Sequence, residues 1–105
     1  MSFQIIWSAF AEEQLDGIFD YYCTNVSFEI ARNLLISLVE STQILVKHPH
    51  IGQEEELLKG REESYRYLVH GNYKIIYSVD AEHRWVKIAD IFDTRQNPVK
   101  MKRTR

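Results

Sequence analysis

Cysteine, glycine and long apolar runs are scarce in this chain of 105 residues, and each scarcity excludes a class of protein. The single cysteine, Cys23, rules out an internal disulfide framework and fits a reducing compartment. It lies in a helical pattern beside Tyr22, so we expect it to pack rather than to react. No apolar run reaches the roughly 18 residues that span a bilayer, and the first residues turn acidic instead of ending at a cleavage site. We therefore expect a cytoplasmic protein that does not enter a membrane.

Motifs for metals, phosphates and activated nucleophiles are also missing. His48 and His50 flank Pro49, but the sequence places no third ligand near them, and the four histidines lack the spacing of a zinc site. The four glycines do not form a phosphate-binding loop, and Ser8 and Ser27 are better explained as helix caps than as nucleophiles. We therefore expect no metal and no cofactor.

The residues that are present predict one folded domain over residues 1–105. Apolar residues make up 45% of the chain, which is enough to fill one core at this length. The charge is uneven, because residues 95–105 hold five Lys or Arg and no acid, whereas the net charge of the whole chain is −2. A basic tail on an acidic body indicates a local site for an anionic partner. The alternative is that residues 99–105 form a flexible, solvated terminus.

The N-terminal half predicts one strand and two helices. The run FQIIW at residues 3–7 is typical of a strand, and Ser8 follows it as a helix N-cap. Apolar residues then recur at helical spacing over residues 9–24 and again from a second cap, Ser27, until Pro49 ends the pattern. The short connection between the helices predicts an antiparallel hairpin.

The C-terminal half predicts three strands after a polar connector, residues 49–63. We expect its acidic cluster at residues 54–56 to be solvated, and Leu57 and Leu58 to form either a short strand or a turn. From Ser64 the apolar period changes to two, which predicts strands over residues 64–70, 72–80 and 84–92. His70, Gly71 and Asn72 supply the turn of the first hairpin.

The order β-α-α-β-β-β predicts an α+β fold in which the helical hairpin covers one face of a small, curved antiparallel sheet. The pairing of the first strand is not fixed by the sequence. We expect the inward-facing positions of the central strands to include Tyr65, Tyr67, Ile75 and Tyr77. Arg66 and Lys74 then lie on the opposite face, which is a candidate working surface.

Three cations lie in or just after the predicted strands: Arg66 in the second strand, Lys74 in the third and Arg95 just past the fourth. The curvature of the sheet could gather them into one cationic patch with Tyr67 or Tyr73 at its edge, able to hold a phosphate and stack on bases. The ordinary alternative is a solvated face on which these cations pair with Asp90 or Asp93. RNA cleavage needs a proton donor and an acceptor near the scissile phosphate, and neither Tyr nor His follows Arg95.

The element order, the stretch YRYLVHGNYKIIYSVD and the stretch VKIADIFDTRQNP together resemble the RelE/ParE superfamily of toxins from bacterial type II toxin–antitoxin modules. The resemblance covers nearly the whole chain. It implies a curved sheet with two N-terminal helices and a cognate antitoxin that wraps and blocks the toxin, as a hetero-oligomer or alongside a homodimer. RelE-like members are ribosome-dependent endoribonucleases that use basic residues on the sheet, whereas ParE-like members act on DNA gyrase.

Departures from the RelE-like pattern favour the ParE-like, plasmid stabilisation branch, whose members are not enzymes, and one of them is that the Tyr of the RelE-like C-terminal segment has no counterpart here. Lys74 stands where RelE-like enzymes carry an Arg, so it keeps the charge but loses the planar fork that recognises phosphate. The acidic run at residues 54–56 stands where those enzymes are rich in Lys. If the chain is RelE-like instead, the resemblance implies that Lys74, Arg95 and Arg66 are catalytic. A third hypothesis is a toxin fold that has lost its activity and only binds its antitoxin.

Overall fold

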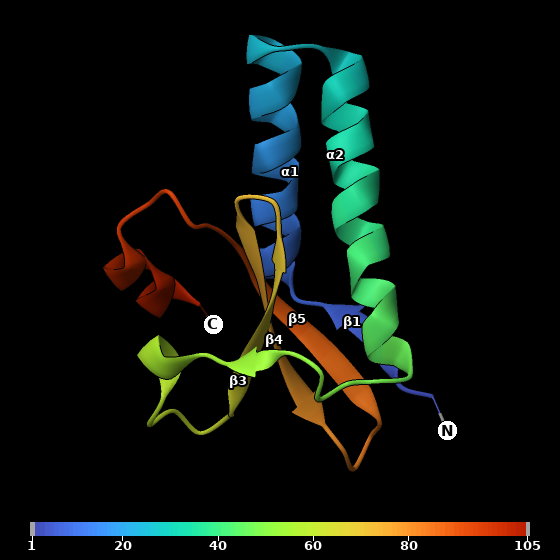
Figure 1. Ribbon diagram of the computed structural model, residues 1–105, viewed down its shortest axis with the longest axis vertical. Helices are drawn as coiled ribbons and strands as arrows, with labels where there is room; N and C mark the ends of the chain where they lie inside the picture. The colour runs from blue at the N-terminus through green and yellow to red at the C-terminus, as the bar shows by residue number, and fades with distance from the viewer. Residues whose placement is uncertain (1, 105) are drawn as a thin grey trace.

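A helical hairpin and a five-stranded sheet make up the computed structural model, which describes residues 2–104 (Figure 1). The elements in chain order are β1 (Gln4–Trp7), α1 (Ala9–Asn25), α2 (Phe28–Ser41), η1 (Thr42–Val46), β2 (Gln53–Glu54), η2 (Glu56–Leu58), β3 (Tyr65–His70), β4 (Tyr73–Asp80), β5 (Trp85–Asp93) and η3 (Pro98–Arg103), where η is a 3₁₀ helix. The predicted α+β class and the order of the main elements are confirmed. The two-residue strand β2 and the 3₁₀ segments are additions.

The two helices begin where the sequence predicts, but α2 ends earlier. The hydroxyl oxygens of Ser8 and Ser27 accept hydrogen bonds from the third backbone N–H of each helix, at 3.0 and 3.1 Å. The α-helix then stops at Ser41, because Ser41 and Thr42 donate their hydroxyls to carbonyls one turn earlier and the chain tightens into η1. Neither α1 nor α2 combines the length and apolar content of a membrane-crossing helix, and this holds for every helix within residues 2–104.

The sheet is mixed rather than antiparallel throughout. Its strand order is β1-β5-β4-β3-β2, and β1 pairs with β5 in the parallel direction, from Gln4 opposite Trp85 to Trp7 opposite Ile88. The other neighbours are antiparallel, as predicted. A parallel pair needs a long crossover connection, and here the helical hairpin and the three following strands provide it. The spacing of apolar residues does not indicate whether a strand pairs with a distant strand in the parallel or the antiparallel direction.

The predicted inward face of β3 is wrong. The register places Arg66 opposite Tyr77 and Tyr67 opposite Ile76, and directly paired residues point to the same face of a sheet. Tyr77 belongs to the core cluster beneath the helices, whereas Tyr67 packs against a second cluster on the other face. Arg66 therefore lies on the helical side and Tyr67 on the opposite side. Arg66 and Tyr67 alternate between the two faces as expected, but each lies on the face opposite to the predicted one.

Apolar side chains are buried on both faces of the sheet. The larger cluster lies between the sheet and the helical hairpin, and includes Leu38, Leu45, Ile75, Tyr77 and Ile88. The smaller cluster lies where η2 and η3 cover the far face, and consists of Leu58, Tyr65, Ile76, Ala89, Phe92 and Met101. In Figure 1 the C-terminal segment lies on the side of the sheet away from α2, and the two helices extend beyond the sheet. The far face is thus partly closed by the end of the chain.

The acidic connector is not uniformly solvated. Glu54 and Glu56 are exposed, but the side chain of Glu55 is only 4% exposed. Its burial is compensated by an ion pair with Lys74, as a buried carboxylate requires. Leu57 and Leu58 lie in η2, so the turn alternative was right for them.

Candidate functional site

Lys74 and Tyr67 lie together on the far face of the sheet. The Lys74 ammonium is 4.1 Å from the centroid of the Tyr67 ring, which is cation–π distance. The same ammonium is 2.8 Å from Glu55 Oε1, and the Lys74 side chain is 23% exposed. Lys74 therefore compensates a buried carboxylate and is largely engaged within the chain.

Arg66 is separated from Lys74 by the thickness of the sheet, because the two face opposite sides. Its Nη1 donates to the carbonyl of Gly52 at 2.8 Å and more weakly to that of His50 at 3.3 Å. The N–H of Gly52 in turn donates to the Tyr77 hydroxyl at 2.9 Å. Arg66 thus fixes the connector against the sheet, and the single patch of three cations expected from the sequence does not form.

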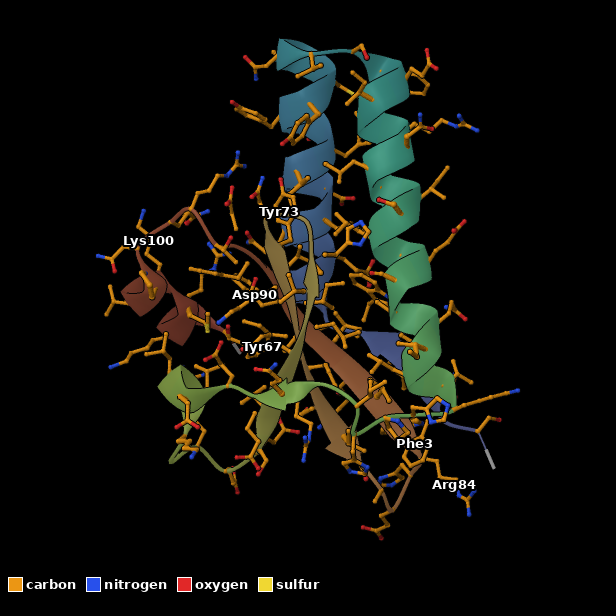
Figure 2. The ribbon with its side chains drawn as sticks, in the orientation of Figure 1. Phe3, Tyr67, Tyr73, Arg84, Asp90 and Lys100 are labelled. Atoms are coloured by element: carbon orange, nitrogen blue, oxygen red, sulfur yellow. The ribbon has the colours of Figure 1, made fainter. Side chains whose placement is uncertain are left out.

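Tyr73 and Arg95 do come together, at the end of β5 beside α1. Arg95 makes a bidentate ion pair with Asp93, with Nε to Oδ1 at 2.9 Å and Nη2 to Oδ2 at 2.7 Å. Tyr73 pairs with Asp93 across the strands and is buried against the helical side. In Figure 2 Tyr73 lies beside α1, whereas Tyr67 lies lower, toward the C-terminal segment. The sequence-predicted residues therefore occupy three separate places.

A cleft of about 560 Å³ runs between α1 and the segment that follows β5. Its lining residues are Gln14, Gly17, Ile18, Tyr21, Tyr22, Val26, Tyr73, Ile91, Asp93, Arg95, Gln96 and Arg103. Half of the lining residues are apolar or aromatic, and Arg95 stands at the rim with its side chain 57% exposed. Of the three predicted cations Arg66, Lys74 and Arg95, Arg95 has the most exposed side chain.

The pKa values of three ionisable groups at this cleft are shifted away from neutral pH. The Arg95 guanidinium lowers the pKa of Asp93, chiefly through their hydrogen bonds. Burial, followed by the neighbouring Tyr22 hydroxyl, raises the pKa of Tyr73. Asp93, followed by Tyr22, raises the pKa of Arg95. A general acid or base works best with a pKa near the working pH, so these three groups are arranged to hold charge or a hydrogen bond.

Asp90 forms a second polar centre, which the sequence did not predict in this form. Its carboxylate is fully buried and accepts hydrogen bonds from Thr104 Oγ1 at 2.9 Å and from Arg103 at 3.2 and 3.3 Å. The Arg103 guanidinium also lies over the rings of Phe10 and Phe92. Arg61 donates to the carbonyl oxygens of Lys102 and Thr104. Together these contacts fasten the basic tail, of which Arg105 lies outside the described residues.

A β-bulge explains why Asp90 faces the tail. Ile76 pairs with Asp90 and Tyr77 pairs with Ile88, so Ala89 has no partner of its own in β4. As a result Ala89 and Asp90 both point to the far face. The signal that could have found this centre is the carboxylate itself, since an acid inside the apolar run VKIADIF must find a cation or donor when buried.

Within the described residues, 2–104, no three His, Cys, Asp or Glu side chains are grouped closely enough to hold a metal ion. Cys23 is a partly buried free cysteine in α1.

Comparison with known protein families identifies the family of this chain. The family model for the ParE toxin of the type II toxin–antitoxin system parDE matches residues 5–98. The chain belongs to this family. The predicted membership of the RelE/ParE superfamily is thereby confirmed.

Solved structures agree with the ParE-family assignment. The chromosomal ParDE system from P. aeruginosa matches with a TM-score of 0.72 and 22% identity, over 87% of this chain and 95% of that one. The RelBE2 toxin–antitoxin complex from Mycobacterium tuberculosis matches with a TM-score of 0.64 and 19% identity, over 89% and 99%. At these identities the likeness concerns the fold. No curated protein sequence gives a significant match.

Two features of this ParE-family toxin depend on contacts between residues far apart in the sequence. The exposed Arg95 stands at the rim of a cleft along α1, and the basic tail is folded back onto Asp90. Arg66 and Lys74 are engaged elsewhere, by backbone carbonyls and by Glu55.

Proposed function

We propose that this ParE-family chain inhibits growth by binding DNA gyrase in the cytoplasm, and that a cognate antitoxin neutralises it. The family match over residues 5–98 supports a toxin of a type II module. The residues at the rim of the cleft favour a binding role over RNA cleavage. In a plasmid setting such a pair would act in plasmid stabilisation.

The observation that carries this proposal is the exposed Arg95 side chain at the rim of the cleft, which two hydrogen bonds to Asp93 hold in place. Asp93 has a lowered pKa, and Tyr73 and Arg95 have raised ones, so the pKa values move away from the working pH. Proton transfer to or from RNA would need the opposite arrangement. A permanently charged, exposed guanidinium is instead well suited to a lasting contact with an acidic or phosphate-bearing surface.

We assign the target contact to Arg95, with Tyr73 behind it as support. The Arg95 side chain is more than half exposed, and its orientation is fixed by two hydrogen bonds to Asp93. Such a preorganised side chain loses little conformational freedom on binding. Arg66, Lys74 and Tyr67 are assigned a smaller, structural share, because their side chains are only partly exposed, whereas that of Arg95 is exposed.

The test is expression of the chain alone, followed by two assays on the purified protein. We expect growth arrest and inhibition of gyrase supercoiling, with messenger RNA intact in a translating extract. Co-expression with the product of the adjacent reading frame should restore growth. Normal supercoiling at excess toxin together with cut messenger RNA would support a RelE-like endonuclease instead. Normal growth on expression alone would indicate a toxin fold without activity.

A further inference from the structure

The segment that follows β5 carries its positive charge on a backbone that is held in place. The last turns of this segment form η3, which includes three basic residues, and residues 95–104 contain no Asp or Glu. Thr104 and Arg103 bind the buried carboxylate of Asp90, and Met101 is 1% exposed within the far-face cluster. The lysines of η3 are therefore presented by a fixed segment and not by a loose tail.

Lys100 and Lys102 leave η3 toward solvent. Both are exposed, and within residues 2–104 neither of them forms an ion pair. In Figure 2 Lys100 lies on the outer side of the C-terminal segment, whereas Asp90 lies on the side of the sheet. Arg61, which is also exposed, donates to the carbonyl oxygens of Lys102 and Thr104 and so adds a third cation beside η3. We call Arg61, Lys100 and Lys102 the tail patch.

The charge of the tail patch is not compensated by a carboxylate, unlike that of its neighbours. Arg103 is paired with the buried Asp90 at 3.2 Å. Lys59, which lies in the same connector as Arg61, is paired with Glu56 at 3.0 Å. An anionic partner can therefore bind the tail patch without breaking an ion pair within the chain, although the net charge of the whole chain is −2.

The side chains around the tail patch favour a nucleic-acid duplex as the partner. Protein interfaces are rich in aromatic residues and poor in lysine, and single strands stack their bases on exposed aromatic rings. The rings that Arg61 and Arg103 contact are largely covered, since Tyr65 and Phe92 are 7% and 1% exposed. Lysine binds a phosphate as a point charge, and a duplex offers closely spaced phosphates without any need for stacking.

We propose that the tail patch binds the phosphate backbone of duplex DNA. Lys100 and Lys102 supply the phosphate contacts, and Arg61 adds its charge while it holds the backbone of η3. Asp90 and Thr104 act only by positioning the segment. Contacts to phosphate carry no sequence information, so we expect binding without sequence preference. The inference goes beyond the proposed binding of gyrase and does not depend on it, because its test contains no gyrase.

The test titrates the full-length chain against a fluorescent DNA duplex of about 20 base pairs, with anisotropy as the readout, from about 50 to 200 mM salt. We expect a dissociation constant on the order of 10 µM at the lowest salt, and a slope of log K against log salt of about −2 to −3. The double variant Lys100→Gln with Lys102→Gln should bind at least about tenfold more weakly and lose about 2 from this slope.

A charge-matched double variant is the control. Arg32→Gln with Lys47→Gln also removes two exposed cations, but these lie in α2 and directly after η1. It should bind DNA like the wild type. Equal losses in the two double variants would show that only the net charge of the chain matters, and this would overturn the inference. Circular dichroism establishes that each variant is folded.

Thr104→Val tests whether the fixed backbone contributes, because it removes the hydrogen bond to Asp90 and changes no charge. It should weaken DNA binding by roughly threefold at an unchanged salt slope, since the lysines must then be ordered on binding. Thr104→Ser keeps the hydroxyl and should bind like the wild type. Unchanged affinity of Thr104→Val would mean that the lysines act from a loose tail, and the tail patch as a preorganised surface would be wrong.

Two other polyanions distinguish duplex DNA from other partners. Single-stranded RNA should bind more weakly, because each phosphate contact on a single strand releases fewer counterions. Polyglutamate, which carries charge but no phosphate, should also bind more weakly. Tighter binding of the RNA or of polyglutamate than of the duplex would overturn the inference in favour of an RNA or an acidic protein. Failure of the wild-type chain to bind the duplex at about 50 mM salt would overturn it outright, and the proposed binding of gyrase would be unaffected.

Discussion

Thr104 donates its hydroxyl hydrogen to Asp90, with 2.9 Å between Thr104 Oγ1 and Asp90 Oδ2. Both residues are buried, and Arg103 completes the shell of the carboxylate. A terminal segment rich in basic residues is therefore fastened to the middle of the last strand. Met101, which is 1% exposed, adds apolar burial to the same attachment.

Arg103→Ala is expected to destabilise the fold by about 3 kcal/mol, because it leaves the buried Asp90 without its cation. The free energy of unfolding from urea titration measures this. Lys102→Ala, which changes an exposed neighbour, should stay within about 0.5 kcal/mol of the wild type. Equal stabilities of the two variants would show that the tail is not anchored through Asp90.

Acid should destabilise the wild-type chain more than the Arg95→Gln variant. The pKa of Asp93 is lowered from its ordinary 3.8, mainly by hydrogen bonds from Arg95. A lowered pKa in the folded state adds stability above the ordinary pKa, and this stability is lost as the pH falls through the folded pKa. The urea midpoint at pH 7 and pH 3 measures the difference. An identical loss in Arg95→Gln would contradict the coupling, and Lys100→Gln serves as the charge-matched control.

Arg95→Ala is expected to abolish growth inhibition with little change in melting temperature, because its exposed side chain contributes little to the core. Arg95→Lys should recover only part of the activity, since lysine keeps the charge but not the planar fork. Growth curves after induction and the supercoiling assay measure both. Lys47→Ala removes another exposed cation and should remain fully toxic. Toxicity of Arg95→Ala equal to the wild type would move the target contact elsewhere.

Gly52→Ala is expected to destabilise the fold by about 2 kcal/mol or more. An added Cβ would lie 2.5 Å from the Tyr77 hydroxyl oxygen and 2.7 Å from the Tyr67 carbonyl oxygen. The connector would have to move, and the hydrogen bond from Gly52 to Tyr77 would be lost. Chemical denaturation measures the cost, and Gly17→Ala, the same exchange in open space, should have the opposite sign. A wild-type stability for Gly52→Ala would mean that the connector is not held in place.

Local patterns predicted the elements well, because they depend on neighbouring residues. Ser8 and Ser27 cap the helices, and the period of two after Ser64 marks β3 and β4. The candidate site was less predictable. Arg66 and Lys74 are each in the expected strand, but the phase of the pleat, which decides their faces, is set by contacts with β4.

The sequence by itself determined the elements, their order and the family, because helical spacing, strand alternation, caps and turns are local properties. Only the tertiary structure decided that β1 runs parallel to β5, that Glu55 pairs with Lys74, and that the tail returns to Asp90. Each of these joins residues far apart in the chain. Their partners follow from the burial of charge and from the closure of the sheet, which no local spacing records.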